Sequence, residues 1–372
     1  MKYSSLESEY LVSLIISAVN SKPAPPSPEG IDWEKLVKLA ESQQVYSVIC
    51  ESDFVGMPSK QAEEIKLYNQ NELLRTIAMK SELDAIEAEL ASNGIKHILL
   101  KGVVLRNYYP KQKMRQMSDI DILYDSSKQS VIFDIMKQRG FICSNSDDNS
   151  DDFIKKPFYT FEFHRELFFK ESDFCPEFNY VWDNAVQDGE NEFLYRMKLE
   201  DMYVYNICHM YKHFRKNCCG IRFLLDNYLF LSKESDKLDW AYIDKYLEKF
   251  GICEYERRAR QIAFKVFNGE RLNDEEKKQL FLYTSFGVYG DEDGHAVRRF
   301  SEYSKKNGKL LSWIKFIFRR LFPEKDDMKY DYPFVESKPY LMIFAYIHRL
   351  IKAVFNPAKI ISTLKSVGKF SK

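Results

Sequence analysis

The sequence ILLKGVVLRNYYPKQKMRQMSDIDILY, residues 98–124, carries the strongest structural signal in the chain. Its last part, SDIDILY, alternates acidic with aliphatic side chains, which is the pattern of a β-strand that faces a core on one side. On such a strand Asp119 and Asp121 point to one face, about 6–7 Å apart, while Ile120 and Ile122 point to the other. The sequence therefore predicts two neighbouring carboxylates on one strand.

Two carboxylates so close together repel one another, and a divalent cation bound between them keeps both ionised. Oxygen ligands favour Mg²⁺ or Mn²⁺, and Mg²⁺ commonly takes one or two carboxylates together with substrate phosphates. The alternative is an edge strand that turns its polar face to water. For an isolated D-x-D we regard that alternative as equally good. The choice between a metal site and a solvent-exposed edge strand therefore depends on the neighbouring sequence.

The flanking segments favour a site. Upstream, KHILL ends in Lys101-Gly102, the pattern of a strand that enters a tight turn, where glycine lets backbone amides approach a phosphate. Downstream, FYTFEFH predicts a second strand with Phe161 and Phe163 on one face and Glu162 with His164 on the other. A third carboxylate at Glu162 would complete a metal site or deprotonate an attacking hydroxyl.

These motifs resemble the uncharacterised nucleotidyltransferases of the polymerase-β superfamily. The resemblance rests on Leu100-Lys101-Gly102, on Tyr109-Pro110, on Arg115-Gln116-Met117-Ser118-Asp119-Ile120-Asp121 and on Glu162 with His164. It covers roughly residues 95–167, with a weaker match in residues 199–230. Two departures are visible: LKG replaces the usual Gly-Ser of the superfamily, and Glu162 stands where aspartate is usual.

The resemblance implies a Mg²⁺- or Mn²⁺-dependent enzyme that transfers a nucleoside monophosphate from a nucleoside triphosphate, with ATP the expected one, to an unidentified hydroxyl and releases pyrophosphate. It implies that Asp119, Asp121 and Glu162 hold metal and act in catalysis. The substrate-binding residues it implies are Lys101, Gly102, Arg115, Ser118, His164, His209 and His213. For Lys101 and Arg115 an internal ion pair is an equally good interpretation. A catalytically weak or inactive nucleotide sensor or protein partner is the rival function.

Helical periodicity surrounds this core on both sides. After the Pro/Ser-rich segment SKPAPPSPEG, residues 32–50 and 59–93 show helical spacing, with Ser59 a plausible N-cap and Gly94 a left-handed stop. From residue 198 onward, helical patterns return. We expect an α+β fold, a polymerase-β-like core with flanking helices. Its predicted parts are residues 1–93 (helical), 94–195 (catalytic core), 196–308 (helical domain) and 309–372 (basic amphipathic tail).

Charge and cysteine content limit the possible partners and the compartment. The chain has 372 residues, with 55 Lys+Arg against 55 Asp+Glu, so it has no global field for nucleic acid and no DNA partner is expected. The seven cysteines are scattered without a C-x-x-C pair, which fits reduced thiols. No signal peptide or long apolar segment is evident, so we expect a cytoplasmic protein.

The tail from Lys309 combines aromatic residues with an excess of roughly eight positive charges. Basic amphipathic helices can lie on an anionic membrane. They can also pack their apolar side against the rest of the protein, which is the interpretation we favour here. The acids and prolines of FPEKDDMKYDYPF suit a surface loop between such packed helices.

Two weaker signals lie in the second half. His209 and His213 are four residues apart on one helix, a spacing that can bind zinc, with Cys208, Cys218 and Cys219 nearby. A zinc cluster is the less favoured interpretation, because the glutamate of H-E-x-x-H is absent. Asp226 falls on an apolar helix and needs a partner, for which Arg222 or one of these histidines is expected.

Overall fold

The computed structural model describes residues 5–52, 54, 56–169, 172, 174, 178, 180–189, 191–323, 328, 332, 334–355 and 357–371. Contacts divide the chain into two compact units. The larger comprises Leu6–Tyr211 with Ile221–Leu272, and the smaller comprises Met1–Ser5, Lys212–Gly220 and Asn273–Lys372. The predicted loop segment at residues 324–333 lies largely outside the described residues, as does Cys175, whereas the other six cysteines are free thiols.

In the larger unit, the described residues before the sheet form four helices. They are α1 (Leu6–Val19), α2 (Trp33–Ser42), α3 (Tyr46–Ile49) and α4 (Ser59–Ser92). The Asp32 side chain caps α2 by accepting from the Lys35 amide, as expected of a short acidic side chain at an N-cap. The left-handed backbone of Gln44 (φ 51°) divides residues 32–50 into two helices.

Helix α4 confirms the long helix predicted over residues 59–93, and Gly94 adopts the left-handed backbone predicted for it (φ 64°). Two details of that prediction were wrong. The N-cap residue is Pro58, and Ser59 is the first helical residue. The spacing also predicted Leu73 and Ile77 in the buried stripe with Ile65, Leu83, Ile86 and Leu90, but both are exposed. The buried stripe is Ile65, Glu72, Met79, Leu83, Ile86 and Leu90. Leu73 and Ile77 lie one or two residues off the face that packs on the sheet.

Seven strands form one mixed sheet in the order β3-β4-β5-β2-β1-β7-β6. The three predicted strands are confirmed as β1 (His97–Leu99), β2 (Ile120–Tyr124) and β5 (Tyr159–His164). The others are β3 (Ile142–Ser146), β4 (Ser150–Lys155), β6 (Val186–Asp188) and β7 (Asn191–Arg196). Strands β2 and β5 are parallel, as are β1 and β7, and the remaining neighbours are antiparallel.

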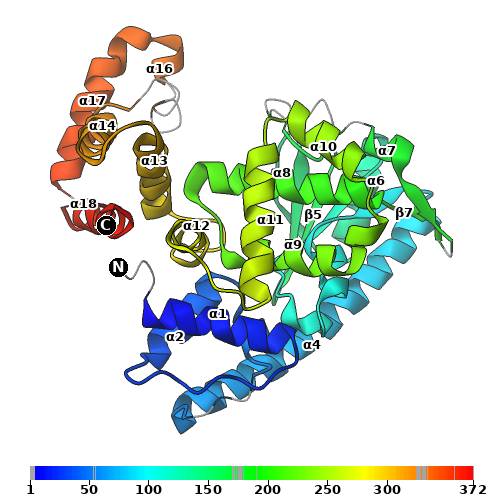
Figure 1. Cartoon of the computed structure of the whole chain (residues 1–372). Coiled ribbons are helices and arrows are strands. Elements are labelled where there is room, and N and C mark those ends of the chain that lie inside the picture. The colour runs from blue at the N-terminus through cyan, green and yellow to red at the C-terminus, as the bar shows by residue number, and fades with distance from the viewer. Residues whose placement is uncertain are drawn as a thin grey trace. The chain divides into compact units, whose positions relative to one another are not determined.

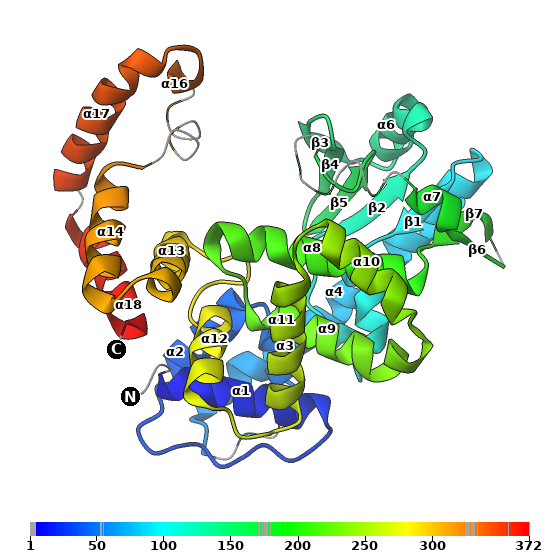
Figure 2. The ribbon, with the colours of Figure 1, turned by 45° about the horizontal axis from the view of Figure 1, so that its top comes forward.

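Helices cover both faces of the sheet (Figures 1 and 2). On one face Ile120, Ile122, Phe161 and Phe163 pack against α4 and α6 (Gln129–Gln138). On the other face Ile98, Leu100 and Leu123 pack against α8 (Leu199–Asn217), α9 (Ile221–Glu234) and α10 (Trp240–Lys249). The α+β class predicted from the sequence is therefore confirmed.

The predicted return of helices after residue 198 is confirmed. Besides α8 to α10 the described helices of this region are α11 (Cys253–Phe267), α12 (Asp274–Thr284), α13 (Glu292–Lys306), α14 (Lys309–Leu321), α16 (Phe334–Ser337), α17 (Met342–Val354) and α18 (Pro357–Phe370). Two single-turn helices, α5 (Gly102–Leu105) and α7 (Val181–Asn184), lie earlier in the chain. Among the described residues, none of the helices is both long enough and apolar enough to cross a membrane.

Candidate active site

The candidate site lies on the sheet face that α8 to α10 cover. Strands β2 and β5 pair in parallel so that Asp121 lies beside Glu162, and β4 places Asp152 on the other side of Glu162. Because strand neighbours point to the same face, three carboxylates form a row across three adjacent strands. Strand β5 has the predicted alternation: Phe161 and Phe163 lie in the core, and Glu162 and His164 lie on the opposite face.

Asp121, Glu162 and His164 form a compact group. The His164 Nε2 atom lies 2.9 Å from Asp121 Oδ1 and 3.4 Å from Glu162 Oε1. Ligand atoms of the three side chains all lie within 4.8 Å of one another. Ser150 Oγ donates to Glu162 Oε1 at 2.9 Å and fixes the glutamate from the neighbouring strand. The resulting acid–imidazole group is buried apart from part of Glu162.

Lys101 supplies the positive charge at this group. Its Nζ atom donates to Asp121 Oδ1 at 2.6 Å. The backbone of Lys101 has φ 47° and ψ −119°, a conformation that favours glycine, at the point where β1 ends and α5 begins. A strained residue at a buried charge is typical of a functional position, and here the strain aims the side chain at Asp121.

The charges shift the neighbouring carboxyls in opposite directions. Burial alone would raise the pKa of Asp121, but Lys101 and His164 hold that pKa well below the ordinary aspartate value. Burial raises the pKa of Asp119, and the charge of Asp121 adds to the effect. Burial also raises the pKa of Glu162. Asp121 is thus the carboxylate that stays ionised, while Asp119 and Glu162 hold protons to higher pH.

Asp119 lies one residue before β2, not within it, because the strand begins at Ile120. Its carboxylate accepts from the exposed Ser118 hydroxyl at 3.1 Å. The charge of Asp121 contributes to the raised pKa of Asp119, but Asp119 does not belong to the group of Asp121, Glu162 and His164. The structure therefore brings two of the three predicted metal-binding carboxylates together and adds a histidine to them.

Arg115 forms an internal ion pair, which was one of the two interpretations of this residue that the sequence allowed. Its Nε and Nη2 atoms donate to Asp226 Oδ1 and Oδ2 at 2.7 and 2.9 Å, and the Tyr109 hydroxyl donates to Oδ1 at 2.7 Å. Asp226 thus pairs with Arg115 and Tyr109, where Arg222 or a histidine was expected, because the loop before β2 reaches α9 across the fold. The bidentate pair is buried and fixes that loop.

Gly102 has a packing reason to be glycine. A Cβ atom at this position would lie 3.2 Å from Met117 Cγ and 3.3 Å from Met117 Sδ. The two segments on either side of the loop that joins β1 to β2 therefore approach closely at Gly102. An alanine at position 102 would require the Met117 side chain to shift by a few tenths of an ångström.

His209 and His213 both lie on α8, as predicted. The His209 ring lies 6.4 Å from that of Tyr205 and 5.7 Å from that of Phe223, and the His213 ring lies 4.9 Å from that of Tyr289. Among the described residues, the metal-binding group of Asp121, Glu162 and His164 contains neither histidine. In the same part of the chain no zinc cluster forms with Cys208, Cys218 or Cys219.

Three residues near the site were missed from the sequence. Asp152 lies in SDDFIK, where adjacent acids and serine suggest a loop, and burial raises its pKa. Ser150, which bonds Glu162, lies in the same segment. Tyr205 on α8 is fully buried. Burial raises the pKa of its phenol; the charge of Lys101 lowers that pKa, and the charges of Asp121 and Glu162 raise it. Helical periodicity marks Tyr205 only as a core residue, so no sequence signal distinguishes it.

The donor set fits a divalent cation. Two carboxylates and one imidazole suit Mn²⁺, and with added phosphate oxygens they suit Mg²⁺. In the described part of the chain no hydrogen bond reaches Asp121 Oδ2 or Glu162 Oε2, so each carboxylate keeps one oxygen for a cation. A cation there would share Asp121 with the ammonium of Lys101.

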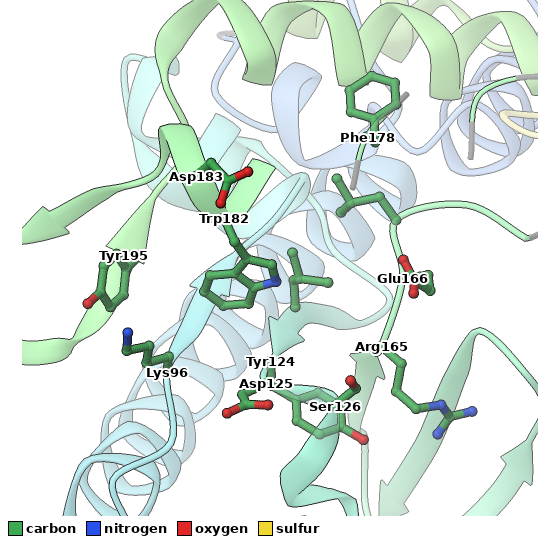
Figure 3. A pocket seen from close by; sticks show the side chains of 12 residues that line it. Lys96, Tyr124, Asp125, Ser126, Arg165, Glu166, Phe178, Trp182, Asp183 and Tyr195 are labelled. Atoms are coloured by element: carbon green, nitrogen blue, oxygen red, sulfur yellow. The ribbon is translucent and has the colours of Figure 1, made fainter. Parts of the chain in front are cut away.

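A cavity of about 490 Å³ opens farther along the same face of the sheet. Leu123, which pairs with His164 in the β2–β5 register, lines it. Figure 3 shows Trp182, Asp183 and Tyr195 on one side of the cavity and Arg165 with Glu166 on the other. Its described lining residues include none of the residues predicted for the site.

Comparison with known proteins gives one family. Residues 29–268 match the family described as "Uncharacterised nucleotidyltransferase". Among solved structures, the solution structure of the antibiotic-resistance factor ANT(2'')-Ia is similar with a TM-score of 0.36 and 9% identity, over 48% of this chain and 98% of that one. That similarity is too low to carry an argument. No curated protein matches the chain with significance.

Proposed function

We propose that this chain, which belongs to the family of uncharacterised nucleotidyltransferases, transfers a nucleoside monophosphate from a nucleoside triphosphate to a hydroxyl acceptor. The observation that carries the proposal is the buried group of Asp121, Glu162 and His164, with the Lys101 ammonium on Asp121. Such a group combines metal-binding oxygens, a proton acceptor and a positive charge on one sheet face. Phosphoryl transfer needs these three features and little covalent chemistry from the protein.

In the proposed reaction the acceptor oxygen bonds to the α-phosphorus, the bond from that phosphorus to the β-phosphate oxygen breaks, and pyrophosphate leaves. Asp121 and Glu162, with Asp119, would hold Mg²⁺ or Mn²⁺, which supplies charge neutralisation for the triphosphate. Glu162 or His164 would take the proton of the acceptor hydroxyl. Lys101 would move from Asp121 to a phosphate oxygen as substrate binds, and ATP is the triphosphate we propose.

The other predicted substrate contacts have narrower proposed roles. Because Arg115 forms a buried ion pair with Asp226, we propose that it positions the loop carrying Ser118 and Asp119. Gly102 would keep Met117 close behind the same loop. For His209 we propose a contact with the nucleotide base or the acceptor, through the ring that also neighbours Tyr205. His213, the other histidine predicted to bind substrate, follows one helical turn farther along α8, in the unit that contains Lys212–Gly220.

For the acceptor we propose the neighbouring cavity. Its volume lies in the range of small-molecule sites. The carboxylates of Asp125, Glu166 and Asp183 together with the Trp182 ring suit a molecule with several hydroxyl or amino groups. Leu123, which lines the cavity, follows Asp121 by two residues, roughly 7 Å along β2. Trp182→Ala should abolish the binding of small polar ligands and leave triphosphate binding unchanged.

Calorimetric titration with each of the four ribonucleoside triphosphates, with and without Mg²⁺, tests the proposed function. We expect metal-dependent binding of one triphosphate that disappears in the folded Asp119→Asn/Asp121→Asn variant. Asp188→Asn on β6 is the matched control, because it removes a carboxylate far from the group in the sheet order. Binding that persists in the double variant would contradict the proposed site.

A second function is favoured by two observations. The Lys101 ammonium is already bonded to Asp121, and the usual Gly-Ser serine is replaced in LKG, so the fold could serve as a nucleotide sensor or a protein partner without turnover. Under that proposal a triphosphate binds but no pyrophosphate is released with any acceptor. If the folded wild-type chain binds none of the four triphosphates, the partner role is favoured.

A further inference from the structure

The last three long helices, α14, α17 and α18, expose apolar side chains in ordered stripes. We define the exposed stripe of α14 as Leu310, Leu311, Ile314, Ile317, Phe318 and Leu321. These residues recur every three to four positions, so they occupy one continuous side of the helix. The exposed fractions remain high, for instance 76% for Leu310 and 56% for Ile314.

Helix α14 is apolar on two sides. Its inner side, with Phe316 and the partly buried Trp313, packs into a core with Phe300 of α13 and with Val367 and Phe370 of α18. The packing predicted for the tail is therefore confirmed for this inner side. The exposed stripe lies on the other side, where the described residues do not cover it.

Helix α17 repeats the arrangement. Ile343, Phe344, Ile347 and Ile351 are exposed along it, and Phe355 follows with 83% of its surface exposed. Ile343, Ile347, Ile351 and Phe355 are spaced by four residues, so they too form one stripe. The opposite side, at Ala345, contacts Met328 and Val335. Helix α18 adds Ile361 and Leu364 as exposed apolar residues.

The charge of these helices has a single sign. Their sequences contain nine lysines and arginines and no aspartate or glutamate, whereas the whole chain has formal net charge zero. Lys309, Lys315, Lys352, Lys365 and Lys369 are exposed on the helices that carry the apolar stripes. Basic residues beside an exposed apolar face are typical of helices that lie in the plane of a membrane interface.

We propose that α14, α17 and α18 form a docking surface for an anionic lipid membrane. The apolar stripes would enter the boundary between headgroups and acyl chains, and the lysines would contact the lipid phosphates. A second copy of this chain is a poorer occupant, because a symmetric contact would bring two sets of nine positive charges together. The proposal is independent of the proposed function.

Vesicle co-sedimentation of the full chain tests the proposal. We expect binding to vesicles of phosphatidylcholine and phosphatidylglycerol in equal parts, and much weaker binding to phosphatidylcholine alone. Lys309→Gln/Lys352→Gln/Lys365→Gln should weaken binding to the anionic vesicles by about fivefold for each lysine removed. Ile314→Ser/Phe318→Ser and Ile347→Ser/Ile351→Ser should each abolish it.

A matched control comes from α4. Leu67 and Leu74 are exposed by 60% and 65%, outside the docking surface, so Leu67→Ser/Leu74→Ser should leave vesicle binding unchanged. Because all these side chains are exposed, the variants should keep the wild-type circular dichroism spectrum. Equal binding to both vesicle types, or no binding by a folded monomer, would overturn the proposal. A wild-type dimer that the α14 or α17 variants dissociate would instead show that a second copy covers the surface.

Discussion

At the scale of single residues, Lys101 joins backbone strain to buried charge. A left-handed backbone at a non-glycine residue costs on the order of 1–3 kcal/mol, and the ammonium it positions bonds a buried carboxylate. Glycine would relieve the strain but lose the charge. The position therefore exchanges stability for an ammonium at Asp121, which is typical of a site rather than of a core.

Replacing Lys101 with glycine and with alanine separates these two contributions. Both variants leave Asp121 without its ammonium and should lose triphosphate binding. Because only glycine adopts φ 47° without strain, we expect Lys101→Gly to be more stable than Lys101→Ala by about 1 kcal/mol in urea unfolding. Equal stability of the two variants would show that this backbone conformation is not strained in solution.

The opposite pKa shifts at the site predict a pH dependence of metal binding. A carboxyl with a raised pKa keeps its proton to higher pH, and a cation must displace that proton. Mn²⁺ affinity should therefore rise as pH increases through the raised pKa values of Asp119 and Glu162, and level off above them. Asp121 should not contribute to this rise, because its pKa is lowered.

Mn²⁺ titrations from acidic to neutral pH, by calorimetry in two buffers of different ionisation enthalpy, measure both the affinity and the protons released. Asp119→Asn should reduce the number of protons released, whereas Asp188→Asn should leave it unchanged. An affinity that is constant over this pH range would be inconsistent with raised pKa values at the metal ligands.

At the scale of elements, the pair of Arg115 and Asp226 fastens α9 to the loop before β2. Removing one partner leaves a buried charge unpaired, so Arg115→Met or Asp226→Leu alone should lower the free energy of unfolding by about 3–5 kcal/mol. Replacing both should recover most of that loss, because no charge then remains unpaired.

Urea unfolding of the two single variants and the double variant gives the coupling energy directly. Tyr109→Phe, which removes only the hydroxyl that donates to Asp226, is the mild control and should cost about 1 kcal/mol. Additive losses in the double variant would mean that the two side chains act independently in solution.

The elements also show what the sequence could predict. Ile120 and Ile122 alternate with charged residues, and Phe161 with Phe163 flank Glu162, so β2 and β5 followed from local pattern. Strands β3 and β4 are rich in serine and aspartate, which are typical of loops, so Asp152 escaped notice. The partner of Arg115 lies 111 residues away, and only the tertiary fold determines such a pairing.

At the scale of the whole molecule, the proposed functions fall in different units. The group of Asp121, Glu162 and His164 lies in the unit of Leu6–Tyr211 with Ile221–Leu272, whereas the proposed docking surface lies in the unit that contains Asn273–Lys372. The family match ends at residue 268, before the segment Asn273–Lys372 that makes up most of the smaller unit. Nucleotide binding and membrane docking can therefore be measured as separate properties of one chain.

Differential scanning calorimetry of the full chain should show this separation as two unfolding transitions. A ligand that binds only the folded site stabilises that unit by about 2.7 kcal/mol at 100 times its Kd. With Mg²⁺ and the bound triphosphate, the transition of the larger unit should rise by several degrees while the other stays in place. Asp121→Asn should remove the shift, and Ile347→Ser/Ile351→Ser should not. A single transition that moves as a whole would show instead that the two units unfold together, since α8 runs from one into the other.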